Sequence, residues 1–203
     1  MGLPDFSYEQ AALARGLTTV CGIDEAGRGP WAGPVVAAAV ILDPANIPEG
    51  LNDSKKLSAK KRDILFGEIC TRAIIGIGIA EVEYIDRHNI LAATLWAMGQ
   101  AVRGLGVAPR IAFVDGNRAP ALPCLVETIV RGDSHSLSIA AASIIAKVTR
   151  DRLMIALDAE LPGYGFARHK GYGTAVHRLA LARLGPSIQH RRSFAPIARL
   201  LGR

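Results

Sequence analysis

Four acidic residues stand where a predicted strand or helix begins or ends. Asp24 and Glu25 follow an apolar run. Asp115 closes another such run just before Gly116, and Asp133 comes shortly before a long helical segment. In an open α/β sheet, ligand crevices form where strands end. If Asp24 and Asp115 lie on neighbouring strands, their carboxylates meet at one edge of the sheet.

Four carboxylates gathered without paired bases would repel one another, and the repulsion would raise their pKa values. A divalent cation normally holds such a cluster, and oxygen-only ligands beside a polyanionic substrate favour Mg²⁺ or Mn²⁺. Because successive strand residues face opposite sides of a sheet, Asp24 and Glu25 cannot both reach one metal site from an ideal strand. We therefore expect Glu25 to lie past the regular end of its strand, or to contribute its backbone carbonyl as well.

Each acid also has a purely structural interpretation. Asp133 could only cap the helix that follows it, and Asp115 before a glycine could be a turn residue. The Asp24-Glu25 pair could be a solvated strand end. Taken one at a time, these residues leave both interpretations open.

The Gly27-Arg28-Gly29 element follows the first acid pair. Glycines let backbone N–H groups approach a ligand closely, since no Cβ stands in the way. Arg28 adds a fork of donors suited to phosphate or 2′-hydroxyl oxygens. A tight hairpin would explain the glycines equally well.

The apolar pattern predicts the elements that must position these residues. Strands are expected where apolar residues run nearly unbroken, as in a well-covered sheet: 18–25, 34–42, 73–82, 110–116 and 124–130. Helices are expected at 58–72, 83–104 and 136–161, with Ser58 as an N-cap. The glycines in 73–82 predict close packing by a neighbour. These segments indicate one α/β protein, in which residues after Pro162 could form a small subdomain.

Positive charge is concentrated near the C-terminus. The 203 residues carry 24 Lys and Arg against 18 Asp and Glu, a net charge of +6. Residues 161–203 contain no acid and eight of the bases: Arg168, Lys170, Arg178, Arg183, Arg191, Arg192, Arg199 and Arg203. The first 160 residues hold the other 16 bases and all 18 acids, so the whole excess lies in the last fifth. Such a basic region is typical of proteins that bind a polyanion, and a solubilising tail is the alternative.

Several classes of protein are disfavoured. Cys21, Cys70 and Cys124 show no CxxC or close Cys/His spacing, which argues against a disulfide framework and a zinc site and fits a reducing cytosol. The N-terminus lacks the pattern of a secretory signal. No stretch reaches the roughly 20 apolar residues that cross a bilayer. We expect a soluble, cytoplasmic protein with no membrane partner, and a monomer by default.

Six motifs in a fixed order resemble bacterial ribonuclease HII, the type 2 ribonuclease H family. They are GIDEAGRGPWAGPVVAAAVIL, LNDSKKLS, FVDGN, RGDSHSLSIAAASIIAKVTRDRLM, YGFARHKGYGT and HRRSF, and the match runs from about Val20 to Pro196. The resemblance implies the ribonuclease-H-like α/β fold, with a mixed five-stranded sheet flanked by helices and a small helical C-terminal part. It implies one domain over 1–203, with 162–203 a basic subregion packed on it.

The resemblance also implies roles for individual residues. The family's catalytic, metal-binding acids match Asp24, Glu25, Asp115 and Asp133. The family motif that recognises the 2′-hydroxyl at a ribonucleotide-to-deoxyribonucleotide junction matches Gly27, Arg28 and Gly29. The family tyrosine that stacks on the next deoxyribose matches Tyr172. Segments expected to line the phosphate path contain Lys55, Ser143 and Lys147. Trp31 and Gly173 stand where leucine and proline are more usual, and we interpret both as local packing variation.

The implied activity is cleavage of the RNA strand of RNA–DNA hybrids, and nicking on the 5′ side of single ribonucleotides in duplex DNA, as in ribonucleotide excision repair. It implies two Mg²⁺ or Mn²⁺ ions, one activating water and the other stabilising the departing 3′-oxygen, to leave 3′-hydroxyl and 5′-phosphate ends. A non-catalytic hybrid-binding module and a DNA nuclease of the same fold are the alternatives. A binder of polyanions would gain nothing from four clustered carboxylates. Docking onto a polymerase clamp or a transcribing polymerase is left open.

Overall fold

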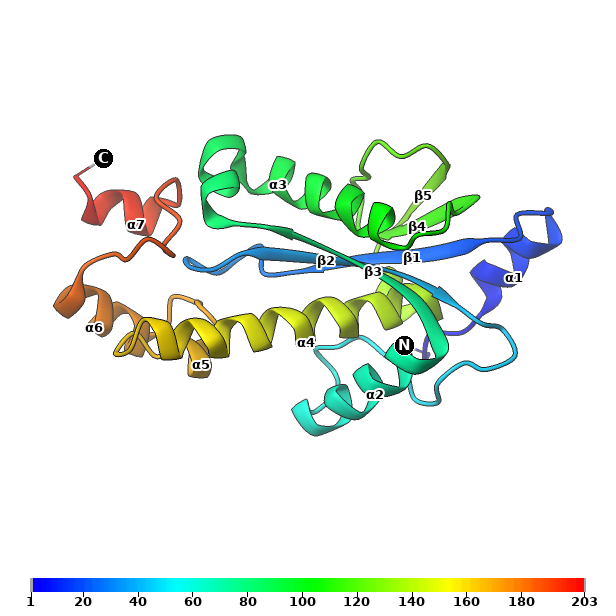
Figure 1. The fold of residues 1–203 in the computed structure, drawn as a ribbon, viewed down its shortest axis with the longest axis horizontal. Helices are drawn as coiled ribbons and strands as arrows, with labels where there is room; N and C mark the ends of the chain where they lie inside the picture. The colour runs from blue at the N-terminus through cyan, green and yellow to red at the C-terminus, as the bar shows by residue number, and fades with distance from the viewer. Residues whose placement is uncertain (1, 203) are drawn as a thin grey trace.

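The computed structural model describes residues 2–202, which form a five-stranded sheet between layers of helices (Figure 1). In chain order the elements are α1 (Ser7–Ala14), β1 (Val20–Ala26), β2 (Val35–Leu42), α2 (Ala59–Arg72), β3 (Ala73–Ala80), α3 (Val82–Gly104), β4 (Ile111–Asp115), β5 (Leu125–Ile129), the 3₁₀ turn η1 (Gly132–Ser134), α4 (Leu137–Glu160), α5 (Phe166–His169), α6 (Ala175–Leu184) and α7 (Ala195–Leu200). The predicted strands and the three long helices are confirmed to within about two residues at each end, the usual uncertainty of such boundaries.

The sheet is mixed, as predicted. Its strand order is β3-β2-β1-β4-β5, with antiparallel pairing from β3 to β1 and parallel pairing from β1 to β5. In the β1–β4 ladder Ile23 lies opposite Val114. The next residues along these strands are Asp24 and Asp115, so the parallel pairing brings the two acids to the same edge.

Helices cover both faces of the sheet, α3 on one side and α4 with α2 on the other (Figure 1). The apolar run of β2 serves both faces. Val35, Ala37 and Ala39 pack in the core beneath α3, whereas the alternate residues pack beneath α2 and α4. Burial on both faces explains why this strand is continuously apolar rather than alternating.

Glycines let α3 approach β3 at backbone distance. A Cβ at Gly76 would collide with the carbonyl of Ala101, and one at Gly78 with the carbonyl of Ala97. This contact confirms the close packing predicted from the glycines of this strand.

The start of α4 packs on β1 in the same way. A Cβ at Gly22 would collide with the backbone of Ser138 and Ile139, in the first turn of α4. Because strand side chains alternate, Asp24 lies on the same face of β1 as Gly22. Asp24 is therefore directed toward the N-terminal end of α4.

Side-chain caps define where the long helices begin. The Ser58 hydroxyl accepts a hydrogen bond from the Lys61 N–H at 3.3 Å, which confirms the predicted cap of α2. At α4 the cap is Ser136, which accepts from the Ile139 N–H at 3.2 Å. The short helices α5, α6 and α7 lie together near the C-terminal end of α4 (Figure 1). Within residues 2–202, no helix combines the length and apolarity needed to span a membrane.

Candidate active site

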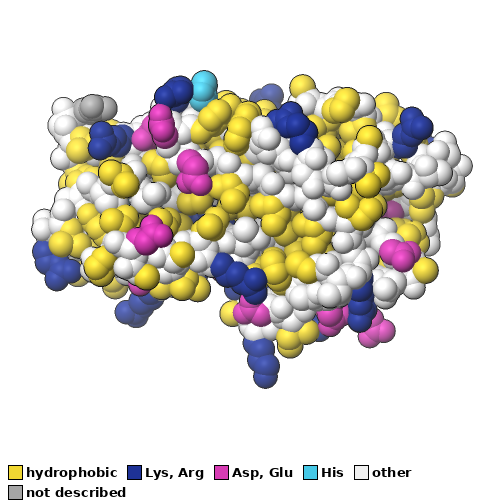
Figure 2. Space-filling model, in the orientation of Figure 1, with side chains coloured by type: hydrophobic (Ala, Val, Ile, Leu, Met, Phe, Trp, Pro, Cys, Tyr) yellow, Lys and Arg dark blue, Asp and Glu magenta, His cyan; other side chains and the backbone are white. Residues whose placement is uncertain are grey.

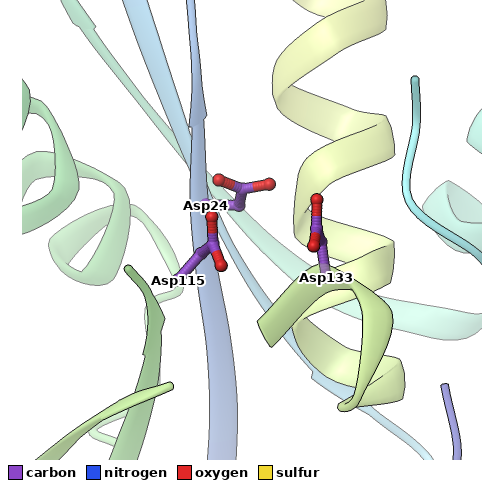
Figure 3. A group of neighbouring side chains, drawn as sticks. All are labelled: Asp24, Asp115 and Asp133. Atoms are coloured by element: carbon purple, nitrogen blue, oxygen red, sulfur yellow. The ribbon is translucent and has the colours of Figure 1, made fainter. Parts of the chain in front are cut away.

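Three aspartates from distant parts of the chain converge at one edge of the sheet. Figure 3 shows Asp24 projecting from β1, Asp115 from the end of β4, and Asp133 from η1 toward a common space. One carboxylate oxygen from each lies within 4.8 Å of those of the other two. Asp24 and Asp133 are only 4% and 5% exposed, so the group is largely shielded from water.

Local backbone contacts fix these carboxylates. The Asp24 carboxylate accepts a hydrogen bond from the Glu25 N–H at 2.6 Å. The Asp115 carboxylate accepts from the Gly132 N–H at 2.7 Å, which ties the end of β4 to η1. Gly116 has φ +96°, a conformation that favours glycine and lets the chain turn away directly after Asp115.

The alternative role of Asp133 as a helix cap is wrong, because Ser136 occupies the N-cap position of α4. Asp133 lies one turn earlier, in η1. Its carboxylate is 3.9 Å from the Lys55 ammonium. The Asp133 carboxylate is thus directed toward the other acids and does not cap α4.

Burial and mutual repulsion destabilise the charged forms of these acids. Burial raises the pKa of Asp24 well above its ordinary value, and the charges of Glu25 and Asp115 raise it further. Burial also raises the pKa of Asp133, followed by the charge of Asp115. For Lys55, burial lowers the pKa, but the charges of Asp24 and Asp133 outweigh it and the net shift is upward. A divalent cation would relieve this repulsion, and the all-oxygen donor set fits Mg²⁺ or Mn²⁺.

The expected position of Glu25 past the regular end of its strand is wrong. β1 continues to Ala26, and Glu25 pairs with Ala37 of β2. Its carboxylate accepts a hydrogen bond from Arg28 at 3.3 Å and lies outside the group of three aspartates. Burial raises the pKa of Glu25, although the Arg28 charge opposes the shift. The predicted set of four acids is therefore three that converge and one paired with Arg28.

An open cleft of about 300 Å³ connects the acids with the Gly27-Arg28-Gly29 element. It is lined by Asp24, Glu25, Ala26, Gly27, Arg28, Gly29, Ser54, Lys55, Lys147, Arg150 and Tyr172. The Tyr172 side chain is 49% exposed, and a Cβ at Gly29 would lie 3.6 Å from its ring. A larger hollow of about 460 Å³ beside α6 contains a single acid, Asp158, and so lacks the metal-binding pattern.

The other predicted contacts with phosphate divide into two kinds. Lys55 and Lys147 line the cleft, and the Lys147 ammonium donates to Asp151 at 2.7 Å. Ser143 does not face the cleft, because it is 3% exposed. Its hydroxyl accepts from the Ser54 N–H at 3.2 Å and donates to the Ala140 carbonyl. We correct its role from lining the phosphate path to holding the segment that carries Lys55.

The predicted basic surface also needs correction at Arg191, which is fully buried. Arg203 lies outside the described residues. Figure 2 shows one face of the molecule, on which acidic and basic side chains are interspersed rather than gathered by sign. The sequence interpretation also missed Arg150, which is 1% exposed, because a buried arginine and a surface arginine contribute equally to composition. Both arginines lie within matched motifs, RDRLM and HRRSF, and this was their only signal.

The mixed sheet, the acids at the ends of adjacent parallel strands and the cleft with lysines define a metal-dependent nuclease of the ribonuclease-H-like fold. The family model of ribonuclease HII matches residues 21–197, and the chain belongs to that family of endoribonucleases.

Named relatives and solved structures agree with this assignment. The ribonuclease HII of Azorhizobium caulinodans is 60% identical over 192 residues, which are 95% of this chain and 74% of that protein. That of Rhodopseudomonas palustris is 56% identical over 198 residues, 98% and 65% of the two chains. The crystal structure of ribonuclease H2 from Pyrococcus horikoshii has a TM-score of 0.76 at 25% identity, covering 90% of this chain and 96% of that one. The structure of a complex of PCNA with RNase HII from Archaeoglobus fulgidus has a TM-score of 0.73 at 28% identity, covering 85% of this chain and 93% of that one.

Proposed function

We propose that this protein cleaves the RNA strand of RNA–DNA hybrids and nicks duplex DNA on the 5′ side of a single embedded ribonucleotide. The observation that carries the proposal is the shared cleft. Asp24 lines the same cleft as Arg28 and Tyr172, although Tyr172 is far away in the sequence. Residues that could bind metal and residues that could recognise a sugar therefore face one substrate.

Asp24, Asp115 and Asp133 are the proposed metal ligands, and Glu25 is a fourth acid at the side of the group. At this position Mg²⁺ or Mn²⁺, when bound, would supply Lewis acidity that favours activation of water and departure of the leaving oxygen. We propose two ions, as the family resemblance implies. The three aspartates would hold the ions, and the burial of Asp24 and Asp133 would limit access of competing water.

The remaining cleft residues would position the nucleic acid. Arg28 is exposed and can donate to a phosphate or to a 2′-hydroxyl, the group that distinguishes RNA from DNA at a single site. The exposed ring of Tyr172 lies beside Gly29 and offers a flat apolar surface to the neighbouring sugar. Lys55 and Lys147 place positive charge along the cleft for the phosphate backbone.

The test compares three duplexes of one sequence: all DNA, DNA with one ribonucleotide, and an RNA–DNA hybrid. With Mg²⁺ or Mn²⁺, the protein should cut the last two and leave all-DNA duplex intact. Asp115→Asn should still bind the hybrid. Its cleavage rate should fall by a factor on the order of 10³, because the metal loses a charged ligand. Asp63→Asn, which alters an exposed acid paired with Arg152, is the matched control.

Two results would favour the alternatives. Equal cutting of all-DNA duplex would indicate a DNA nuclease. Retention of the hybrid without any nick in either metal would indicate a binding module. Full activity of Asp115→Asn would remove Asp115 from the metal site.

A further inference from the structure

Arg191 is buried beneath the Gly27-Arg28-Gly29 loop. It is 0% exposed, and its guanidinium donates only to backbone carbonyls of the segment that connects β1 to β2. The acceptors are Gly27 at 2.6 Å, Arg28 at 2.9 Å, Gly33 at 2.8 and 3.0 Å, and Pro34 at 3.2 Å. One planar side chain therefore fixes both ends of the loop at once.

Arg150 supports the same segment from α4. Its guanidinium donates to the backbone carbonyls of Pro34 at 2.9 Å, Ala32 at 3.1 Å and Lys170 at 3.0 Å. The Arg150 side chain also fills the space where a Cβ at Gly27 would lie. Gly27 has φ +101°, so its conformation and its surroundings both require glycine.

Neither arginine has a carboxylate within ion-pair distance among residues 2–202. Burial, with a smaller contribution from the Arg150 charge, lowers the pKa of Arg191 to about 9. A buried charge without an opposite charge is costly for folding. Stability alone does not account for two such charges below one loop.

The Gly27–Gly29 loop above the two arginines differs in how its backbone acceptors and donors are bonded. The carbonyls of Gly27 and Arg28 are directed inward to Arg191. The N–H groups of Gly27, Arg28 and Gly29 donate to no acceptor within the part of the chain that the structure describes. Gly27, Arg28 and Gly29 line the cleft with these N–H groups unpaired within the described residues, whereas the carbonyls of Gly27 and Arg28 are bonded to Arg191.

We infer that Arg191, supported by Arg150, is a positioning residue that holds the Gly27–Gly29 loop in the conformation that recognises the ribonucleotide. The inference rests on the proposed function, because it assigns a cause to the discrimination between a ribonucleotide and a deoxyribonucleotide. A guanidinium is required because it donates to four backbone carbonyls at once. Lysine keeps the charge but cannot bridge them.

The test measures binding in the cleavage-inactive Asp115→Asn background. Fluorescence anisotropy gives the Kd for duplex with one ribonucleotide and for all-DNA duplex of the same sequence. The preference is the Kd for all-DNA duplex divided by the Kd for duplex with one ribonucleotide. Arg191→Lys should reduce this preference about tenfold, the effect of losing one good hydrogen bond to an ionised group. Affinity for all-DNA duplex should stay within about twofold, because phosphate contacts carry it. Arg192→Lys is the matched control, since that neighbouring side chain is exposed.

Thermal melting shows whether each variant folds. If Arg191→Lys does not fold, Arg150→Lys takes its place in the binding measurement. A folded Arg191→Lys that keeps the full ratio, or loses affinity equally for both duplexes, would overturn the inference. Failure of both lysine variants to fold would also overturn it, by showing a role in folding alone. If the parent itself shows no preference for the ribonucleotide, the proposed function fails instead, and the inference fails with it.

Discussion

The indole ring of Trp31 lies where a side chain at position 173 would have to be. A Cβ at Gly173 would collide with the Cζ2 and Cε2 atoms of Trp31. The backbone joins the same segments, because the Trp31 N–H donates to the Gly171 carbonyl at 2.8 Å. The two departures from the family pattern are therefore one coupled feature, and it lies directly beside Tyr172.

Gly173→Ala should destabilise the protein by about 1–3 kcal/mol, the usual cost of overpacking. Trp31→Leu in the same chain should remove most of that penalty, because the smaller side chain vacates the space. Urea unfolding of the parent, both single variants and the double variant gives the coupling energy. Simple additivity of the two single effects would contradict the packing described for Trp31.

Gly22→Ala should be among the most harmful single changes in the sheet. The new methyl group would meet the backbone of Ser138 and Ile139, which cannot move without shifting the start of α4. We expect a loss of about 3 kcal/mol or more in the free energy of unfolding, together with loss of cleavage as Asp133 moves. Gly67→Ala in α2 is the control, since its Cβ would meet nothing within 4 Å. It should stabilise the protein by about 1 kcal/mol.

Asp24→Asn should stabilise the metal-free protein, although we expect it to abolish cleavage. Burial and the neighbouring acids make the charged form of Asp24 unfavourable, as its raised pKa indicates. The amide oxygen can still accept from the Glu25 N–H. Melting in a chelator should show a gain of about 1–2 kcal/mol, and the stabilisation by added Mg²⁺ should shrink. A lower melting temperature in the chelator would show that the acids do not strain the fold.

A buried histidine pair should make stability depend on pH. His177 and His190 are both 0% exposed, and their Nε2 atoms are 3.0 Å apart. His190 Nδ1 accepts from the Ser187 N–H, so its Nε2 is assigned the proton that it donates to His177. His177 then donates from Nδ1 to the Tyr172 carbonyl. Both rings are therefore neutral in this arrangement.

Burial lowers the pKa of His177 and of His190 to about 4, from an ordinary 6.5. Between these values the unfolded chain takes up protons that the folded chain does not. Stability is complete above pH 6.5 and should fall as the pH drops toward 4, by up to about 1.4 kcal/mol per pH unit for each histidine. Urea unfolding at stepped pH, compared between the parent and His190→Gln, isolates this effect from that of the acids. Parallel pH profiles for the two proteins would contradict it.

The sequence predicts those parts of the fold that depend on local pattern. β2 is recognisable because both of its faces are buried, and α2 because Ser58 caps it. The meeting of Asp24 with Asp115 followed from their places at the ends of two strands, once those strands were assumed to be neighbours. Such features need only periodicity, caps and the geometry of parallel strands.

Features that depend on which face a side chain takes were not predictable. Glu25 was expected past the end of β1, but pairing with β2 extends farther along that strand than pairing with β4. Ser143 lies in a helix whose pattern does not show that this turn is covered by the Ser54 segment. Arg191 looks like surface charge until the loop above it supplies carbonyls as partners. Each of these required the position of a distant backbone segment.

The parallel pairing of β1 with β4 also has a consequence for how the protein is made. Asp24 is synthesised before β2, α2, β3 and α3, whereas Asp115 closes the strand after them and Asp133 follows β5. Contacts so far apart in sequence carry a loop-closure cost that slows their formation. The proposed metal site is thus absent from any form of the chain in which β1 and β4 have not yet paired. Recovery of cleavage during refolding would report closure of the β1–β4 ladder rather than the formation of any single helix.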